Sequence, residues 1–362
     1  MAISGELIIN LAALARNYNS LDAMSASSCE TAAAVKANAY GLGVCEVVPA
    51  LFRAGARTFF VATLDEAIAV RNVAPLANVC VFNGFVNRAR DVYIEYNLIP
   101  VLNSLFEIEL YRNFAVETGT PLPAIIHFDT GMNRLGVVSD DAKLLCEDMS
   151  LMDGIDLQLI ISHFSSSEEM QNPLNSIQYE RFKYIFPSFT GVKKSLCNSA
   201  GLFLSQDYHL DVVRPGIALY GGCVNSEMQS VISPVVSLNA PILQIHSVKK
   251  GETVGYNETH TFSSDGHVAV ISVGYADGLL RSMFGGSLYW QGYELPICGR
   301  VSMDLLVCDL SNVPQGKYPD IGGMVEVIGE NQSINDLAVS SGTIPYEIIT
   351  SLGSRYNRSY IK

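Results

Sequence analysis

Basic side chains are scarce in this sequence of 362 residues, which has 23 Lys and Arg against 36 Asp and Glu and a formal net charge of −13. Such a chain, without a Lys/Arg run, repels phosphate backbones and anionic lipid surfaces, so we expect no nucleic-acid partner. No apolar run approaches the roughly 20 residues that span a bilayer, so we expect no membrane partner. The N-terminus carries Glu6 and no basic stretch. It does not resemble a secretory signal, which favours a cytoplasmic location.

Several kinds of site are also missing. The eight cysteines include no C-x-x-C pair, and several lie in apolar strand-like runs. They indicate a reducing compartment, and we expect neither a disulfide framework nor a metal site. The sequence also lacks G-x-x-x-x-G-K-S/T, G-x-G-x-x-G after a strand, H-E-x-x-H and G-x-S-x-G. Nucleotide-binding, zinc-protease and serine-hydrolase functions therefore have no support.

Apolar residues, by contrast, are plentiful: 49% of the chain is hydrophobic and only 16% is charged, which is enough for a large core. Eight short apolar or β-branched runs, most about 20 to 35 residues apart, alternate with helical patterns such as 45–55, 64–73 and 105–119. This rhythm predicts an α/β fold of the TIM (β/α)8 barrel type. The runs occupy residues 31–38, 58–63, 78–84, 98–104, 124–131, 157–165, 194–201 and 211–221.

The pattern changes after Gly222. Residues 221–230 have neither a helical nor a strand period and predict a linker. Strands separated by turn residues follow, and they predict a mainly-β domain that ends in short helices near 333–344 and 346–356. We therefore divide the chain into a barrel, residues 1–222, and a β-domain, residues 223–362, and expect the extreme N-terminal strand to pack on the β-domain. The predicted strands lie at 235–248, 252–257, 267–278, 287–311 and 324–330.

Polar side chains stand at the predicted carboxyl ends of the barrel strands, where the active site of this fold lies. Small residues after strands seven and eight, such as Ser199 and Gly216, offer amides to a phosphate group. A lysine opposite a phosphate site, Lys36, favours an imine-forming amine and pyridoxal 5′-phosphate (PLP). Each of these residues, taken alone, is more often a solvated charge, an ion pair or a core histidine. Because they all lie at the same end of one barrel, an active site is the favoured interpretation. The strand-end residues are Lys36, Tyr40, Asp129, Arg134, His163, Asn198, Ser199, Arg214, Gly216 and Ile217.

These residues lie in motifs that resemble the alanine racemases, PLP-dependent enzymes of fold type III. The most specific match is AAAVKANAYGLG, residues 32–43. The resemblance covers essentially the whole chain, in order and across both parts. The further motifs are HFDTGMNRLGV (127–137), ISHFSSSEE (161–169), CNSAG (197–201), VRPGIALYG (213–221), VGYADG (273–278), GRVSMD (299–304) and PYEI (345–348).

The resemblance implies racemisation of L-alanine and D-alanine by two bases, which would supply D-alanine for peptidoglycan. Lys36 would hold the cofactor and act on one face of the substrate, and Tyr275 would act on the other. Arg134 and the backbone at Met303 would bind the substrate carboxylate. Tyr275 and Met303 come from the partner subunit in this family, which implies a head-to-tail homodimer with shared active sites.

The resemblance also implies how PLP is held. Arg214 would donate a hydrogen bond to the pyridine nitrogen and keep it unprotonated. His163 would lie beside the cofactor, near Tyr275 and Arg214. The phosphate group would be held by Tyr40, Ser199, Gly216, Ile217 and Tyr346.

One position departs from the family pattern. Well-known members have, in place of His127, a lysine that becomes carbamylated and orients the arginine. Histidine cannot form that carbamate, so we hypothesise that His127 or a bound anion holds Arg134; the alternative is that His127 only packs under its strand. Leu42, where many members have histidine, is interpreted as loop packing, and Ser302, where some have cysteine, is assigned no chemistry.

Three other functions stay open. A broad-specificity or serine racemase would use the same mechanism in a wider pocket. A fold type III decarboxylase would use a glycine-rich phosphate loop and an acidic partner for the pyridine nitrogen, against which Arg214 and the single glycines argue. A non-catalytic PLP carrier would resemble the first domain only, so the β-domain with Tyr275 argues against it.

Overall fold

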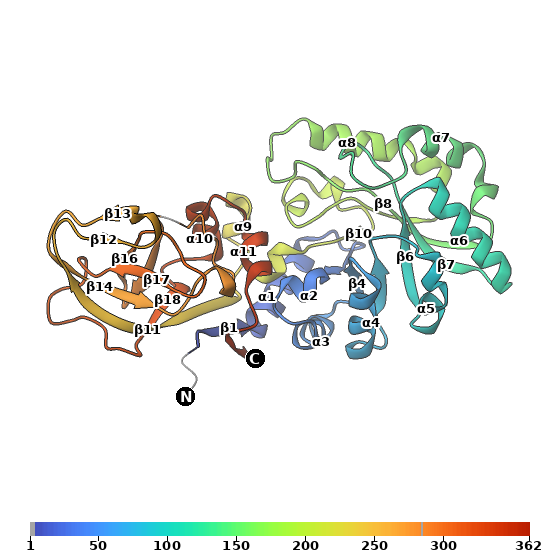
Figure 1. Cartoon of the computed structure of the whole chain (residues 1–362). Helices are drawn as coiled ribbons and strands as arrows, with labels where there is room; N and C mark the ends of the chain where they lie inside the picture. Colours follow the sequence, from blue (N-terminus) through green and yellow to red (C-terminus); the bar gives the residue numbers. More distant parts are fainter. Residues whose placement is uncertain (1–3, 284) are drawn as a thin grey trace.

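The structure, a computed structural model, describes residues 4–283 and 285–362. Figure 1 shows two parts, a barrel surrounded by helices and a strand-rich part. Helix α11 (Pro345–Ser351) lies where the two parts meet. Across the described ranges, no helix combines the length and hydrophobicity that a membrane crossing requires.

The first part is the parallel barrel that the sequence pattern predicts. Strands β3 to β9 pair in parallel in chain order, and β10 pairs in parallel with β2. The Ala32 amide donates to the Val213 carbonyl at 2.9 Å, and the Asp211 amide joins β10 to β9 through the Lys194 carbonyl at 3.0 Å. These bonds close the barrel. Its strands are β2 (Glu30–Thr31), β3 (Ala33–Ala34), β4 (Thr58–Val61), β5 (Asn78–Val81), β6 (Leu98–Leu102), β7 (Leu122–His127), β8 (Ile155–Ile161), β9 (Lys193–Ser195) and β10 (Val212–Val213).

Several strands are shorter than predicted. β9 ends at Ser195, although the apolar run extends over 194–201, and β7, β8 and β10 likewise stop before the predicted ends. Beyond the strand the chain bends into a loop, where amides bond to side chains instead of a neighbouring strand. The Gly201 amide, for example, donates to Asn198 Oδ1 at 2.9 Å. The loops therefore begin earlier than the hydrophobic pattern indicates.

The helices cover the outside of the barrel. α3, α4 and α6 lie within or close to the predicted helical stretches, and Thr63 and Glu66 form a capping box at the start of α4. α1, α7 and α8 lie outside those stretches. The remaining bounds are α1 (Leu11–Met24), α2 (Lys36–Tyr40), α3 (Val44–Ala54), α4 (Leu64–Val73), α5 (Arg90–Glu95), α6 (Leu105–Thr118), α7 (Ser139–Glu147), α8 (Leu174–Tyr184), α9 (Ser226–Gln229) and α10 (Ile334–Ser341).

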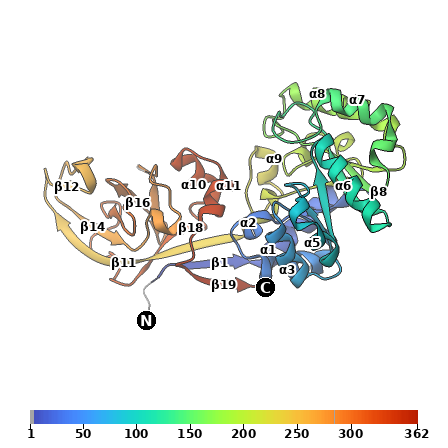
Figure 2. The ribbon, with the colours of Figure 1, turned by 45° about the vertical axis from the view of Figure 1, so that its right-hand side comes forward.

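The second part is built on an eight-stranded sheet with the order β14-β17-β16-β15-β18-β11-β1-β19, in which β14 also pairs with β11. Figure 2 shows the long strand β11 starting near the barrel, beside β1 and β19, and running away from it across the strand-rich part. The N-terminal strand β1 thus pairs with β11, the first strand after the barrel, and with β19, the last strand of the chain. The bounds are β1 (Glu6–Asn10), β11 (Val236–Val248), β12 (Thr253–Val254), β13 (His260–Thr261), β14 (Gly266–Ile271), β15 (Ser287–Trp290), β16 (Tyr293–Cys298), β17 (Leu306–Asp309), β18 (Met324–Ile328) and β19 (Asn357–Ile361).

One continuous core joins the two parts. Leu7 and Leu238 of the eight-stranded sheet belong to the same cluster of buried side chains as Val61 and Leu102 of the barrel. Such packing places the elements of both parts relative to one another with little freedom, because protein interiors are close-packed.

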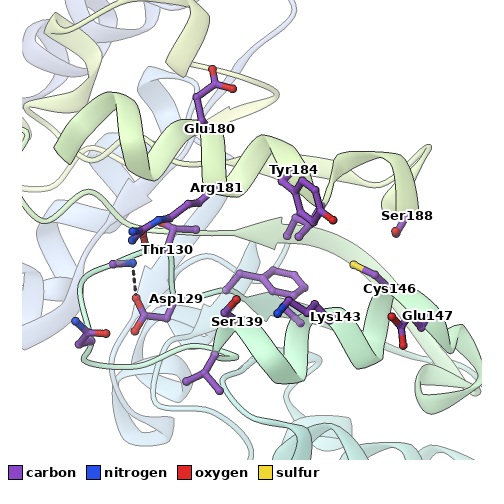
Figure 3. A pocket seen from close by; sticks show the side chains of 16 residues that line it. Asp129, Thr130, Ser139, Lys143, Cys146, Glu147, Glu180, Arg181, Tyr184 and Ser188 are labelled. Carbon is purple, nitrogen blue, oxygen red and sulfur yellow. Dashed lines mark hydrogen bonds between the residues drawn. The ribbon is translucent and has the colours of Figure 1, made fainter. Parts of the chain in front are cut away.

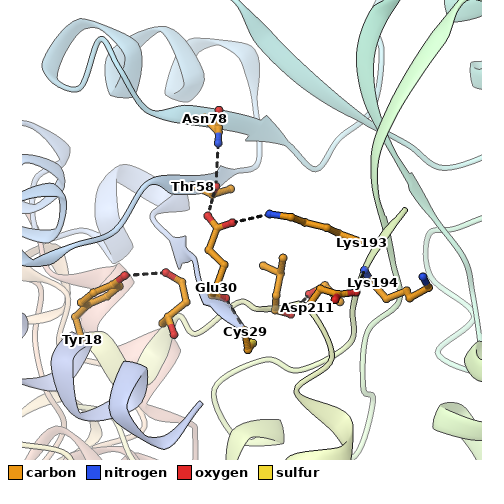
Figure 4. A network of polar contacts seen from close by, with 11 residues as sticks. Tyr18, Cys29, Glu30, Thr58, Asn78, Lys193, Lys194 and Asp211 are labelled. Atoms are coloured by element: carbon orange, nitrogen blue, oxygen red, sulfur yellow. Dashed lines mark hydrogen bonds and ion pairs between the residues drawn. The ribbon is translucent and has the colours of Figure 1, made fainter. Parts of the chain in front are cut away.

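A polar network lies at the amino ends of the barrel strands (Figure 4). Glu30 accepts a hydrogen bond from Thr58 Oγ1 at 2.5 Å and pairs with Lys193 Nζ at 3.4 Å. Asn78 Nδ2 donates to Thr58 Oγ1 at 3.3 Å. This end of a barrel usually serves stability, and the opposite end carries the chemistry.

Candidate active site

Lys36 stands directly after the first barrel strand, at the carboxyl end of the barrel. The four residues from Ala37 to Tyr40 all have a positive φ of 54° or 55°, although none is glycine. This conformation costs about 1–2 kcal/mol for each residue with a side chain, so neighbouring groups must hold it. The Glu66 carboxylate accepts the Ala37 amide at 2.7 Å, and the Tyr40 ring stacks on Tyr220 with centroids 4.5 Å apart. These contacts hold the turn that begins at Lys36.

Ser199 organises the loop after the eighth strand. Its buried Oγ accepts the Gly216 amide at 2.8 Å and the Ala218 amide at 3.3 Å. The short helix η6 (Ile217–Tyr220) begins here, so its first amides have no partner inside the helix. Backbone amides that gather at one point are a cradle for an anion.

Two tyrosines complete this cradle. The Tyr40 ring centroid lies 6.2 Å from that of Tyr346, which comes from α11. A Cβ on Gly216 would collide with Tyr40 Oη, so glycine leaves the room that the hydroxyl occupies. The structure therefore brings together all five residues predicted to hold a phosphate group.

Arg214 is a buried cation whose terminal nitrogens are occupied. Nη1 donates to Ser195 Oγ, and Nη2 donates to the Ser162 carbonyl at 2.6 Å. Burial lowers the pKa of Arg214 to about 10, which leaves the guanidinium charged at neutral pH. Within the described chain Nε donates to no group, so its N–H is available to a ligand at the barrel mouth.

His163 lies beside Arg214, and Arg214 Nη2 is 3.5 Å from its Nδ1. Burial, with the neighbouring Arg214 and Arg134 guanidinium groups, holds the pKa of His163 well below its usual range. The imidazole is therefore neutral at physiological pH. Gln178 supports the same loop, because its Nε2 donates to the His163 carbonyl at 2.9 Å.

His127 is held by Asn103, a residue that the sequence analysis did not select. The Asn103 side-chain nitrogen donates to the Phe82 and Val101 carbonyls at 3.1 and 2.7 Å. This assigns its oxygen as the acceptor towards His127 Nδ1, 2.9 Å away. His127 thus carries its proton on Nδ1 and leaves Nε2 as an acceptor. Asn103 directly follows β6 and is the last residue but one of the predicted run 98–104, so the strand-end argument applied to strand four would have found it.

Arg134 lies close enough to Lys36 for the two charges to interact. Burial, with the Arg134 guanidinium, lowers the pKa of Lys36, against the opposing effect of Glu66. Arg134 itself is exposed, and across residues 4–283 and 285–362 it makes no hydrogen bond, with His127 or with any other group. The arginine is therefore available to a ligand at the barrel mouth.

Tyr275 and Met303 lie in the strand-rich part, in two adjacent turns. Both side chains reach solvent, with 42% and 53% of their surface exposed. Neither is hydrogen-bonded to Lys36 in the described ranges. The structure thus places both side chains at the surface of the strand-rich part.

A cavity of about 870 Å³ lies elsewhere, between α7 and α8 (Figure 3). Asp129, Thr130 and Arg181 line it, and Asp129 is the one strand-end residue named in the sequence analysis that does so. Arg181 donates to the Thr130 carbonyl at 3.0 Å. In the described part of the chain no group of three or more His, Cys, Asp or Glu side chains could hold a metal ion.

Comparison with known proteins assigns the chain to a family. The model of the alanine racemase N-terminal domain matches residues 9–224, and that of the alanine racemase C-terminal domain matches residues 235–360. The alanine racemase of Rickettsia rickettsii is 42% identical over 355 residues, which is 98% of each chain. That of Brucella abortus is 40% identical over 376 residues, covering 100% of this chain and 94% of the relative.

Solved structures agree. An alanine racemase from Bartonella henselae with covalently bound pyridoxal phosphate is 37% identical, with a TM-score of 0.95 and 99% of each chain covered. A biosynthetic alanine racemase from Pseudomonas aeruginosa is 31% identical, with a TM-score of 0.92 over the same share of both chains. The chain therefore belongs to the alanine racemase family.

Proposed function

We propose that this protein interconverts L-alanine and D-alanine with PLP bound at the mouth of its barrel. The observation that carries the proposal is the convergence of Lys36, the Ser199 loop and buried Arg214 at one end of one barrel. When bound, PLP withdraws electrons from the substrate and makes its Cα–H bond acidic. The proposal includes a cofactor-binding domain of residues 1–222 and a β-domain of residues 223–362. It also includes a cytoplasmic location and supply of D-alanine for peptidoglycan.

The residues at the barrel mouth fit PLP. Lys36 would supply the amine that binds the cofactor aldehyde. Ser199 Oγ accepts the Gly216 and Ala218 amides, and its hydroxyl proton would be donated to the phosphate. The free Nε–H of Arg214 suits the pyridine nitrogen. Because the guanidinium stays charged at neutral pH and only donates hydrogen bonds, Arg214 would keep that nitrogen as an unprotonated acceptor.

Lys36 is the base on one face of the substrate. A base must be unprotonated to accept a proton, and the ordinary pKa of lysine, near 10.4, is too high for that at neutral pH. Burial and the Arg134 guanidinium favour the neutral amine, which supports this role. Arg134 binds the substrate carboxylate, because its side chain is exposed and has no protein partner within the described ranges.

Tyr275 is the base on the other face, and it acts in the barrel of a partner chain. Tyr275 and Met303 are exposed on the β-domain, where a second copy can receive them. A head-to-tail homodimer would bring each pair to the other chain's barrel and make two shared sites. The backbone at Met303 would then bind the substrate carboxylate together with Arg134.

His127 stands where well-known family members have a carbamylated lysine, and it offers Arg134 a neutral acceptor instead of an anion. Asn103 leaves the His127 Nε2 lone pair available, and a guanidinium has donors only. Burial, with Arg214 and Arg134 nearby, lowers the pKa of His127 to about 4, so the ring keeps this lone pair at neutral pH. We propose that Nε2 accepts a hydrogen bond from Arg134 when substrate is bound.

Two assays test the proposal. In a polarimetric assay with each alanine enantiomer, wild type should racemise both, whereas Lys36→Ala and Tyr275→Phe should lose racemisation. In deuterium oxide, Tyr275→Phe should still exchange the Cα hydrogen of one enantiomer, because one base remains. Tyr256→Phe, an exposed tyrosine of the same domain, is the matched control. Racemisation at the wild-type rate by Lys36→Ala or Tyr275→Phe would refute the assignment.

A further inference from the structure

The turn that carries Tyr275 is locked to the turn that carries Met303. The Tyr275 amide donates to the Ser302 carbonyl at 3.1 Å, and the Ala276 amide donates to the Met303 carbonyl at 2.9 Å. A Cβ on Gly274 would collide with the Ser302 and Met303 carbonyls. The two turns therefore form one unit, and a displacement of either displaces both exposed side chains.

Arg355 bridges the same two turns from a third segment. Its Nε pairs with Asp277 Oδ1 at 2.7 Å, and its Nη1 pairs with Asp304 Oδ1 at 2.7 Å. Asp277 uses its other oxygen to accept the Gly274 amide at 2.9 Å. The planar guanidinium fixes the relative position of the two carboxylates, because its donors have a rigid arrangement.

We propose that Arg355 is a positioning residue for the reaction, which holds Tyr275 and Met303 in the geometry that the active site requires. Its two side-chain partners are Asp277 and Asp304, so it acts through the turns and not on the reacting atoms. The inference rests on the proposed function, in which both turns enter the barrel of the partner chain.

The C-terminal segment offers a second route for Arg355 to act. Arg358 Nη1 donates to the Gly41 carbonyl at 2.7 Å, and Tyr360 Oη donates to the Leu42 carbonyl at 2.9 Å. These bonds reach the loop that follows Lys36 in the same chain. If Arg355 affects the barrel of its own chain, it does so through these bonds of Arg358 and Tyr360. If it acts through the Tyr275 and Met303 turns, it affects the barrel of the partner chain. The two routes are separable in mixed dimers.

Activity and stability should respond differently to loss of Arg355. The Arg355 side chain is 48% exposed, and its pair with the exposed Asp304 contributes little to folding. The Asp277 side chain is only 10% exposed, but without Arg355 this carboxylate still accepts the Gly274 amide and is not left without a partner. Misplacement of a reacting group by about 1 Å lowers a rate by about 100-fold. We therefore expect Arg355→Ala to lower kcat/KM by about 10- to 100-fold while the thermal unfolding temperature and the oligomeric state change little.

The first test compares three variants of the whole enzyme. Arg355→Ala should lose activity as stated, and Arg355→Lys, which keeps a cation for one carboxylate, should recover part of it. Lys249→Ala, which breaks the exposed pair with Asp265 at 2.8 Å in the same domain, should behave as wild type. Hydrogen exchange of the Tyr275 and Ala276 amides should accelerate in Arg355→Ala only. An unchanged kcat/KM, or exchange equal to wild type, would overturn the proposal.

The second test uses dimers of two differently tagged chains, Lys36→Ala and Arg355→Ala. In a shared-site dimer, one of the two sites then has an intact barrel, from the Arg355→Ala chain, and intact turns, from the Lys36→Ala chain. The other site lacks both Lys36 and Arg355. If Arg355 acts through the turns, this dimer has about half the wild-type activity, because one of its two active sites has all of its residues intact. If Arg355 acts on its own barrel, the only barrel that keeps Lys36 is impaired, the activity is about half that of the Arg355→Ala homodimer, and the proposal is wrong.

A control dimer of Lys36→Ala and Tyr275→Phe separates this inference from the proposed function. It should also have about half the wild-type activity, since Tyr275 enters the partner's barrel. Failure of the control contradicts the shared site itself, and the proposal for Arg355 falls with it. Success of the control together with failure of the Arg355 dimer contradicts the positioning role alone.

Discussion

Protonation of His127 should destabilise the folded protein below pH 6.5, and one substitution isolates the effect. Burial, with the Arg214 and Arg134 guanidinium groups nearby, lowers the pKa of His127 to about 4. In an unfolded chain the pKa of histidine is about 6.5. Between these values the unfolded chain binds a proton that the folded protein does not, so the free energy of unfolding falls as the pH falls.

The size of the effect follows from the two pKa values. Above pH 6.5 the imidazole is neutral in both states and contributes nothing to the pH dependence. At pH 5 the loss is about 2 kcal/mol, and below pH 4 it reaches about 3 kcal/mol. Carboxylates and His163 also titrate in acid, so the informative quantity is the difference between wild type and His127→Gln.

The assay is urea unfolding at one protein concentration between pH 8 and pH 5. Wild type should lose about 2 kcal/mol more than His127→Gln over this range. His246→Gln, at an exposed position of β11, should follow wild type. Parallel curves for wild type and His127→Gln would refute the argument.

In steady-state assays, His127→Ala should raise KM for alanine because Arg134 loses its acceptor. Unchanged kcat and KM would contradict the orienting role.

Two more predictions concern the cofactor side of the site. Gly216→Ala would place a Cβ against Tyr40 Oη, so the affinity of the apoenzyme for PLP should fall about 10- to 100-fold, as measured by fluorescence titration; an unchanged Kd would contradict the cradle. Arg214→Gln removes a cation that disfavours histidinium, so the pKa of His163 should rise in an NMR titration. A His163 titration identical to wild type would exclude that electrostatic effect.

Periodicity was sufficient to predict the barrel and the gathering of its strand-end residues. Parallel strands in one barrel place their carboxyl ends together, so Lys36, His163 and Arg214 had to meet once eight strands alternated with helices. α8 shows where the same reasoning fails. Its buried face includes Asn175 and Gln178, so the apolar pattern that identifies a helix is interrupted.

Local sequence therefore decided the barrel, the β-rich second part and the position of each chemical group along the chain, because these depend on hydrophobic period and residue type. Tertiary structure alone decided the bond from Asn103 to His127, and with it the imidazole tautomer. It also decided that Arg355 joins Asp277 to Asp304. Such contacts depend on the conformations of loops distant in sequence and on distances of a few ångströms, which no periodic pattern encodes.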